Sequence, residues 1–398
     1  MRQPLQDIRV LDLSRLLPAP FATMILADLG ADVIRVESPA AADRLRLVPP
    51  YVNGLSAHFM TINRNKRSVA INLRDPRGRE VFFTLVKTAD VVVEGYKPGT
   101  MDRLGVGYEA VKAVKDDIIY CSVSGYGQDG PLCDHAGHDI NYMGIGAALD
   151  LMTDPDVKPR IPGLFLGDLS GSLYAAIGIL SALVQRQRTG EGAYIDACML
   201  DGLMGLHTFL AARHLIAGLP AEHGTTQVTD AGPCYQIYET KDGRYVTFAP
   251  LEPHFWESFC RLVGRDDLRT RQWASSAVPE VQAIFKQRTR DEWVALSAEH
   301  DFCCEPVLSL DGALQHPQVV ARQMVVQADD PIAGPIQHVA PGVRFGQTRG
   351  EIRLPAPQLG EHSVEVLSQA GVDPDQIDRL MADGVLAAME PPKRDAGS

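Results

Sequence analysis

The sequence predicts an α/β protein that combines a Rossmann-like large domain with a smaller α+β domain. Near the N-terminus, the apolar runs Ile8–Leu13 and Asp32–Glu37 flank the helically spaced Ala19–Leu29, which is a strand–helix–strand pattern. Further short apolar runs follow, and basic residues stand at the ends of several of them. Past the middle of the chain, the turn signal Asp242-Gly243 separates two strand-like runs, which is typical of an antiparallel hairpin.

Length, charge and cysteine content narrow the class of protein. A chain of 398 residues favours two domains over one. The net charge of −12 argues against a general nucleic-acid binder, and the seven scattered cysteines indicate neither a disulfide framework nor a metal site. No apolar run reaches the ~18 residues that a membrane span needs, and the start lacks an apolar signal core. We therefore expect a cytoplasmic protein without nucleic-acid, membrane or metal partners.

The first strand–helix–strand unit differs from a dinucleotide-binding one. Gly30 closes its helix, at a position where a positive backbone angle suits glycine. The turn after the first strand reads Arg-Leu-Leu-Pro-Ala-Pro and lacks Gly-x-Gly-x-x-Gly, which argues against a dehydrogenase. The apolar pattern then predicts a strand over Val69–Leu73 and a helix from about Gly78 to Lys87. It also predicts strands over Ala89–Glu94 and Ile118–Val123.

Basic residues close to the ends of successive strands are candidates for ligand binding. They are Arg35, Arg74, Lys97 and Arg103. In open α/β sheets, ligands bind at the carboxyl ends of the strands. Four cations there, on an acidic chain, indicate a phosphate site. The alternative for any one of them is a solvated surface charge, and the sequence alone gives the two equal weight.

The middle of the chain carries a glycine-rich loop over Ser124–Tyr142. The pattern after it predicts helices over Met143–Leu151 and Leu169–Arg188, a strand over Ala193–Ala197 and helical Leu200–Leu215. In the second unit we expect a helix over roughly Phe255–Leu262 and further helices to about His300. Strands begin again near Val326, a short helix lies near 374–389, and the last residues from 391 are expected to be disordered.

The best candidate for proton chemistry is His138, in the loop. Gly137 before it lets the backbone approach a ligand closely, and Asp139 after it can orient or charge the ring. Taken alone, such a pair is more often structural than catalytic.

Asp168 is the second candidate. It precedes Leu-Ser-Gly-Ser at the start of a helix, where unobstructed backbone amides could stabilise an oxyanion. The alternative, of even weight, is a simple helix cap.

These motifs resemble those of a known family. Gly-His-Asp-Ile-Asn-Tyr at 137–142, Gly-Asp-Leu-Ser-Gly-Ser at 167–172 and Leu-Gly-Glu-His at 359–362 are similar to the class III CoA-transferase family, and the first to its α-methylacyl-CoA racemase branch. The resemblance runs from about Ile8 to about Leu367. It implies an interlocked homodimer whose large domain is built from both termini. The expected division is 1–200 for the large CoA-binding domain, 201–232 for a linker, 233–325 for the small domain and 326–398 for the return.

The resemblance also implies a binding site for coenzyme A as part of the substrate, with no tightly bound cofactor. The loops that hold its adenosine and pyrophosphate in the family match Asn72, Leu73, Arg74, Gly95, Tyr96, Lys97 and Arg103 here. Several relatives carry an arginine where this chain has Ser38, so Arg44 or Arg46 would replace that contact. Tyr142 either lines the acyl pocket or packs beneath the loop.

The function that the resemblance favours is racemisation at the α-carbon of a 2-methylacyl-CoA. His138 and Asp168 would exchange the α-proton on opposite faces, through an enolate. Asp139 would tune His138, as would Glu252, whose Leu-Glu-Pro-His-Phe context is similar to a racemase segment. The alternative is a CoA-transferase in which Asp168 forms an aspartyl-CoA intermediate. A non-catalytic acyl-CoA binder is a third hypothesis.

Overall fold

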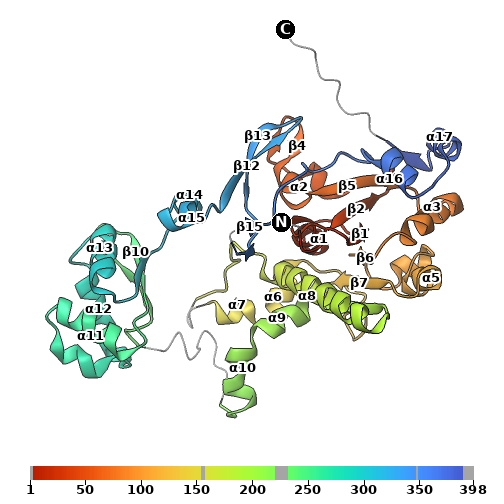
Figure 1. The fold of residues 1–398 in the computed structure, drawn as a ribbon. Coiled ribbons are helices and arrows are strands. Elements are labelled where there is room, and N and C mark those ends of the chain that lie inside the picture. Colours follow the sequence, from red (N-terminus) through yellow and green to blue (C-terminus); the bar gives the residue numbers. More distant parts are fainter. Residues whose placement is uncertain (1–2, 154–156, 220–231, 347, 389–398) are drawn as a thin grey trace, which may run out of the picture. The chain divides into compact units, whose positions relative to one another are not determined.

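Figure 1 shows a computed structural model of the chain, which describes residues 3–153, 157–219, 232–346 and 348–388. The chain forms two compact units. The large unit comprises Met1–Gly146, Pro162–Leu206 and Ala321–Ser398, and the small unit comprises Ala147–Ile161 and His207–Val320. The domain boundaries expected from the sequence stay predictions. Part of the expected linker, 220–231, and the expected disordered end lie outside the described residues.

A seven-stranded sheet organises the large unit. Its strands, from edge to edge, are β16 (Leu386–Ala387), β5 (Lys66–Ile71), β2 (Asp32–Glu37), β1 (Arg9–Asp12), β6 (Val91–Glu94), β7 (Ile119–Ser124) and β8 (Ala193–Cys198). Six of them are parallel and follow the Rossmann order 3-2-1-4-5-6, whereas β16 runs antiparallel to β5. The α/β class with a mostly parallel sheet is therefore confirmed.

Helices cover both faces of this sheet because its strands alternate between two apolar cores. Val10 of β1 packs with α1 (Pro18–Asp28) and α8 (Leu166–Thr189). Its neighbour Leu11 points to the other face, towards α3 (Pro76–Val86), α5 (Tyr108–Val114), α16 (Ser363–Gln369) and α17 (Pro374–Ala382). The sheet is thus enclosed, and its loops at the carboxyl ends of the strands are free to form a site.

The small unit has its own aromatic core. The expected hairpin is present as β9 (Gln236–Glu239) and β10 (Tyr245–Phe248), and β11 (Cys304–Pro306) extends it. Helices α11 (Pro253–Leu262), α12 (Val278–Phe285) and α13 (Arg290–His300) cover one face, where Trp256, Phe259, Phe285 and Trp293 are buried.

The chain forms several further elements. They are α2 (Ala57–Ile62), α4 (Thr100–Arg103), α6 (Asp139–Ile145), α7 (Ala148–Leu151), α9 (Met199–Leu206), α10 (Thr208–Leu215), α14 (Leu310–Leu314), α15 (Pro317–Ala321), the strand pair β12 (Val325–Asp330) and β13 (Gly334–Val339), the two-residue strands β3 (Tyr51–Val52), β4 (Leu55–Ser56), β14 (Arg344–Phe345) and β15 (Thr348–Arg349), and the short 3-10 turns Arg44–Leu47, Asp266–Arg271 and Ser275–Ala277.

Three expected elements differ from the structure. The helix expected at Met143–Leu151 begins earlier, at Asp139, and is interrupted at Ala147, whose φ of 61° is left-handed. The C-terminal helix stops at Ala382, and Gly384, with a φ of 69°, turns the chain into β16. We also expected no apolar stretch long enough to span a membrane. That expectation is wrong for α8, which is long and apolar enough by length and composition. Half of its most apolar window is buried inside the protein.

Candidate active site

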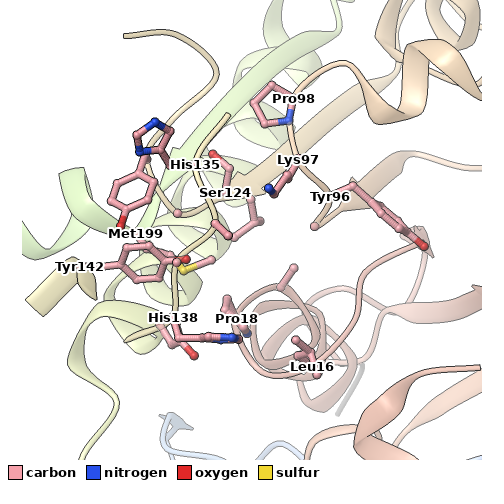
Figure 2. Close-up of a pocket in the computed structure, with 18 of the residues that line it drawn as sticks. Leu16, Pro18, Tyr96, Lys97, Pro98, Ser124, His135, His138, Tyr142 and Met199 are labelled. Carbon is pink, nitrogen blue, oxygen red and sulfur yellow. The ribbon is translucent and has the colours of Figure 1, made fainter. Parts of the chain in front are cut away.

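A pocket of about 280 Å³ opens in the large unit at the carboxyl ends of the parallel strands. Most of its lining residues lie at or after the ends of β1, β6 and β7, or in the first turns of α6 and α8. The helices after β1 and β6 lie on opposite faces of the sheet, so the loops leave a crevice between these two strands. Figure 2 shows the labelled side chains around the opening, with His138 and Pro18 on one side and Lys97 and Pro98 on the other.

We call His138, Asp139 and Asp168 the acid–base wall. His138 directly precedes α6, and its backbone N–H donates to Oδ1 of Asn141 at 3.0 Å. Its side chain is exposed and lines the pocket, as does Asp168 from the first turn of α8. The two residues that we expected to perform proton chemistry therefore share one pocket. His135, interpreted from the sequence as merely solvated, lines it too.

Asp139 makes a contact that the sequence did not indicate. Its carboxylate is buried, and its Oδ1 accepts the backbone N–H of Asp168 at 3.0 Å. Among the described residues, no hydrogen bond joins the side chains of Asp139 and His138. This carboxylate therefore helps to fix the first turn of α8, and its expected tuning of His138 stays a prediction.

The same contact changes the expectation of an oxyanion site at Asp168. The amide of Asp168 is bonded to Asp139, and the amide of Leu169 donates to the carbonyl of Phe165 at 2.9 Å. These two amides are therefore engaged within the protein.

The carboxyl group of Asp168 is electrostatically unusual. Burial raises the pKa of Asp168 to about 7, and the nearby negative charge of Asp139 adds to the shift. No cation contributes to this shift. Near neutral pH, Asp168 is thus divided between a protonated form and a poorly solvated carboxylate, which suits a nucleophile or a proton carrier.

The side chain of Tyr142 occupies the space that a side chain at either of two loop glycines would need. A Cβ atom on Gly125 would lie 2.4 Å from the Tyr142 hydroxyl oxygen, and one on Gly137 would lie 2.7 Å from its ring. Tyr142 is buried, meets Tyr126 edge-to-face at 5.0 Å between ring centroids, and lines the pocket. Tyr142 thus packs beneath the loop and also lines the pocket, while its contact with an acyl group stays a prediction.

We call Arg15, Tyr96 and Lys97, which also line the pocket, the cation wall. Gly95, Tyr96 and Lys97 follow β6, as expected from the sequence, and all three line the pocket. Arg15 was not expected. It follows β1, and its guanidinium carbon lies 4.3 Å from the centroid of the Tyr96 ring. The available signal was its place after the first strand, at the crevice of the predicted sheet.

Arg35 does not offer a cation to a ligand, contrary to the expectation. It is fully buried, and its guanidinium donates to Asp43 at 2.9 Å and to Asn63 at 2.6 Å. Despite burial, the surrounding carboxylates of Glu37, Asp12 and Asp43 raise the pKa of Arg35 further above its ordinary value. Its charge is therefore neutralised beneath the pocket.

The other expected phosphate contacts lie outside the pocket. Arg74 and Arg103 are exposed, and Arg103 donates to the Thr100 hydroxyl at 3.0 Å. Asn72 accepts the Arg74 N–H at 3.1 Å, while Leu73 packs partly against the core. Arg46, suggested as a substitute contact, pairs with Glu37 at 2.6 Å. Binding of coenzyme A by Asn72, Leu73, Arg74 and Arg103 stays a prediction.

Glu252 belongs to the small unit. It is exposed and directly precedes α11. Its expected approach to His138 stays a prediction.

Comparisons with known proteins agree with the motifs. The family model described as CoA-transferase family III matches residues 5–363. A succinyl-CoA:glutarate CoA-transferase of Mus musculus is 35% identical, with 98% of this chain and 91% of that protein covered. An alpha-methylacyl-CoA racemase of Homo sapiens is 31% identical, with 96% and 97% covered. A solved CAIB/BAIF family protein from Brucella suis has a TM-score of 0.81 at 32% identity, covering 93% of this chain and all of that one. The chain therefore belongs to CoA-transferase family III.

Proposed function

We propose that this protein is a CoA-transferase that moves coenzyme A from an acyl-CoA to a carboxylic acid, with Asp168 as the nucleophile. The observation that carries the proposal is the partly buried Asp168 carboxyl, whose pKa is raised to about 7, in a pocket at the carboxyl ends of the strands. A desolvated carboxylate is a stronger nucleophile than a hydrated one.

The proposed reaction has two symmetrical halves. The Asp168 carboxylate attacks the thioester carbonyl, which gives an acyl-aspartyl anhydride and the thiolate of coenzyme A. The thiolate then attacks the Asp168 carbonyl, which releases the first acid and leaves an aspartyl-CoA thioester. A second carboxylate attacks this thioester and forms a new anhydride. Attack by the released thiolate on the new acyl carbonyl yields the product and restores Asp168.

The relatives support this order of functions. The mouse protein named as a succinyl-CoA:glutarate CoA-transferase is more similar to this chain, at 35%, than the human racemase, at 31%. A succinyl-CoA:mesaconate CoA-transferase of Haloarcula marismortui is also similar, at 33%. The transferase, the alternative in the sequence analysis, therefore becomes the main proposal.

Racemisation remains a second candidate because of one observation. His138 and Asp168 line the same pocket, as a two-base exchange of an α-proton requires. In the transferase, His138 would contact the substrate without carrying a proton of the reaction.

A homodimer is part of the proposal. Leu173, Ile177 and Val184 form an exposed apolar stripe along α8 in the large unit, and such a stripe favours burial against another surface. The interlocked arrangement rests on the family resemblance. We also propose a cytoplasmic location, because all seven cysteines are free thiols.

One pair of assays separates the two functions. The protein is incubated in heavy water with a 2-methylacyl-CoA of each configuration, without an acceptor acid, and then with succinyl-CoA and glutarate. We expect glutaryl-CoA to form and no α-deuterium to enter. Deuterium incorporation from both enantiomers, without CoA transfer, would overturn the transferase in favour of the racemase.

A further inference from the structure

Arg15 is a cation in the pocket that the protein itself does not neutralise. Its side chain is exposed, and its guanidinium stacks on Tyr96. Within the part of the chain that the structure describes, no carboxylate forms an ion pair with it. Asp168, the acidic residue that also lines the pocket, is influenced by Asp139 and by no cation. The positive charge of Arg15 is therefore left for a ligand.

The backbone on both sides of Arg15 is held by buried ionic groups. The N–H of Leu16 donates to the Asp43 carboxylate at 3.2 Å, and the N–H of Ser14 donates to Asp12 at 3.0 Å. Arg35 also donates to the carbonyl oxygen of Ser14, at 3.2 Å. These contacts hold Leu16 at a φ of 63°. This left-handed conformation costs a non-glycine residue about 1 kcal/mol or more. Arg15 is consequently presented from a fixed base.

The platform beneath the guanidinium is fixed as well. The N–H of Tyr96 donates to the buried carboxylate of Glu94 at 2.7 Å. Gly95 lies close to the loop after β1, because a Cβ atom there would be 3.5 Å from that of Ser14. The two loops of the cation wall therefore support each other. A planar guanidinium held in this way suits bidentate recognition of a carboxylate.

The size of the pocket indicates which part of the substrate Arg15 meets. At about 280 Å³ it is slightly smaller than the ~300–1,000 Å³ of typical small-molecule sites, so it suits the reacting acyl group rather than a whole acyl-CoA. We propose that Arg15, stacked on Tyr96, binds the second carboxylate of a dicarboxylic acid whose first carboxylate reacts at Asp168. The proposal rests on the transferase function and names the substrate class of the same site.

The test compares two acceptors that differ in one carboxylate, glutarate and pentanoate, with succinyl-CoA as donor. In a ping-pong reaction, kcat/KM for the acceptor reports the second half-reaction alone. A change in how the variant reacts with the donor therefore does not alter this quantity. We expect the wild type to prefer glutarate. The variant R15Q should lose about 10- to 100-fold in kcat/KM for glutarate and stay within about threefold for pentanoate, because a charge-assisted hydrogen bond is lost.

Two further variants complete the design. R15K keeps the charge without the bidentate fork, and we expect an intermediate loss for glutarate only. R188Q removes an exposed cation at the end of α8, outside the pocket, and should change neither acceptor.

The outcomes separate the possible roles. An equal loss for both acceptors in R15Q would overturn the proposal and assign Arg15 to a phosphate of coenzyme A or to packing. A wild type that uses both acids equally would overturn it as well. If the wild type transfers CoA to no acid, the transferase function fails, and this proposal fails with it.

Discussion

The acid–base wall of the pocket is formed by one loop and the helix that it meets, whereas the cation wall joins two loops that are distant in the sequence. In the acid–base wall, the N–H of Asp168 donates to Asp139, and burial together with this neighbouring charge makes Asp168 harder to ionise. In the cation wall, buried carboxylates beneath Arg15 hold the backbone and leave its charge available. One wall thus destabilises a charge for chemistry, and the other preserves a charge for binding.

The comparison predicts its largest effect at Asp168. The variant Asp168→Asn should lower kcat for CoA transfer by about 10⁴-fold or more, because the nucleophile is removed. The measurement is steady-state transfer from succinyl-CoA to glutarate, with the variant Asp134→Asn, an exposed loop residue outside the pocket lining, as control. Residual activity within 100-fold of the wild type would contradict the nucleophilic role.

The second prediction concerns the buried support of the cation wall. Asp43→Ala should lower the free energy of unfolding by about 3–5 kcal/mol, because it removes the carboxylate that pairs with the buried Arg35 at 2.9 Å. Asp383→Ala breaks an exposed pair with Arg77 and should cost less than about 1 kcal/mol. Urea unfolding of both variants gives the comparison. Equal losses would mean that the ionic groups beneath Arg15 are not a structural support.

A third prediction uses the raised pKa of Asp168. An aspartate with a pKa of about 7 in the folded state and about 3.9 in the unfolded state is protonated only in the folded protein between those values. Its contribution to stability therefore falls as the pH rises from about 4 to about 7, and then levels off. Relative to the wild type, Asp168→Asn should gain about 1–3 kcal/mol over this window. Thermal unfolding at pH 5 and pH 8 measures the gain, and a stability difference that is constant with pH would contradict it.

The smallest effect is expected at His138. In a transferase, His138→Gln should change kcat by less than about tenfold, since the histidine carries no proton in the proposed steps. The assay is the same glutarate reaction. A loss of more than 10³-fold would make His138 part of the chemistry and favour a two-base mechanism.

Much of the fold and of the acid–base wall could be predicted because their signals are local. The first strand–helix–strand unit and the Asp242-Gly243 hairpin follow from short apolar patterns and a turn signal. Likewise, His138 and Asp168 stand in recognisable glycine-rich contexts, and both line the pocket.

The cation wall could not be predicted in the same way because it depends on strand order. Arg15 meets Tyr96 only because β1 and β6 are neighbours in the sheet. The opposite error at Arg35 has the same origin. Its position in β2 indicated a ligand-binding cation, but Asp12 on the neighbouring strand β1, together with Glu37 and Asp43, neutralises it in the interior. The contact of Asp139 with the Asp168 amide could not be predicted either, since that amide belongs to another helix, 29 residues further along the chain.

The most direct test of Asp168 as the nucleophile follows oxygen atoms. The protein turns over succinyl-CoA with glutarate labelled with ¹⁸O in both carboxylates, and the peptide that contains Asp168 is then analysed by mass spectrometry. The anhydride steps leave one oxygen of the incoming acid on the aspartate, so we expect ¹⁸O in the Asp168 carboxylate of the wild type. Transfer of CoA without label at Asp168 would contradict covalent catalysis by this residue.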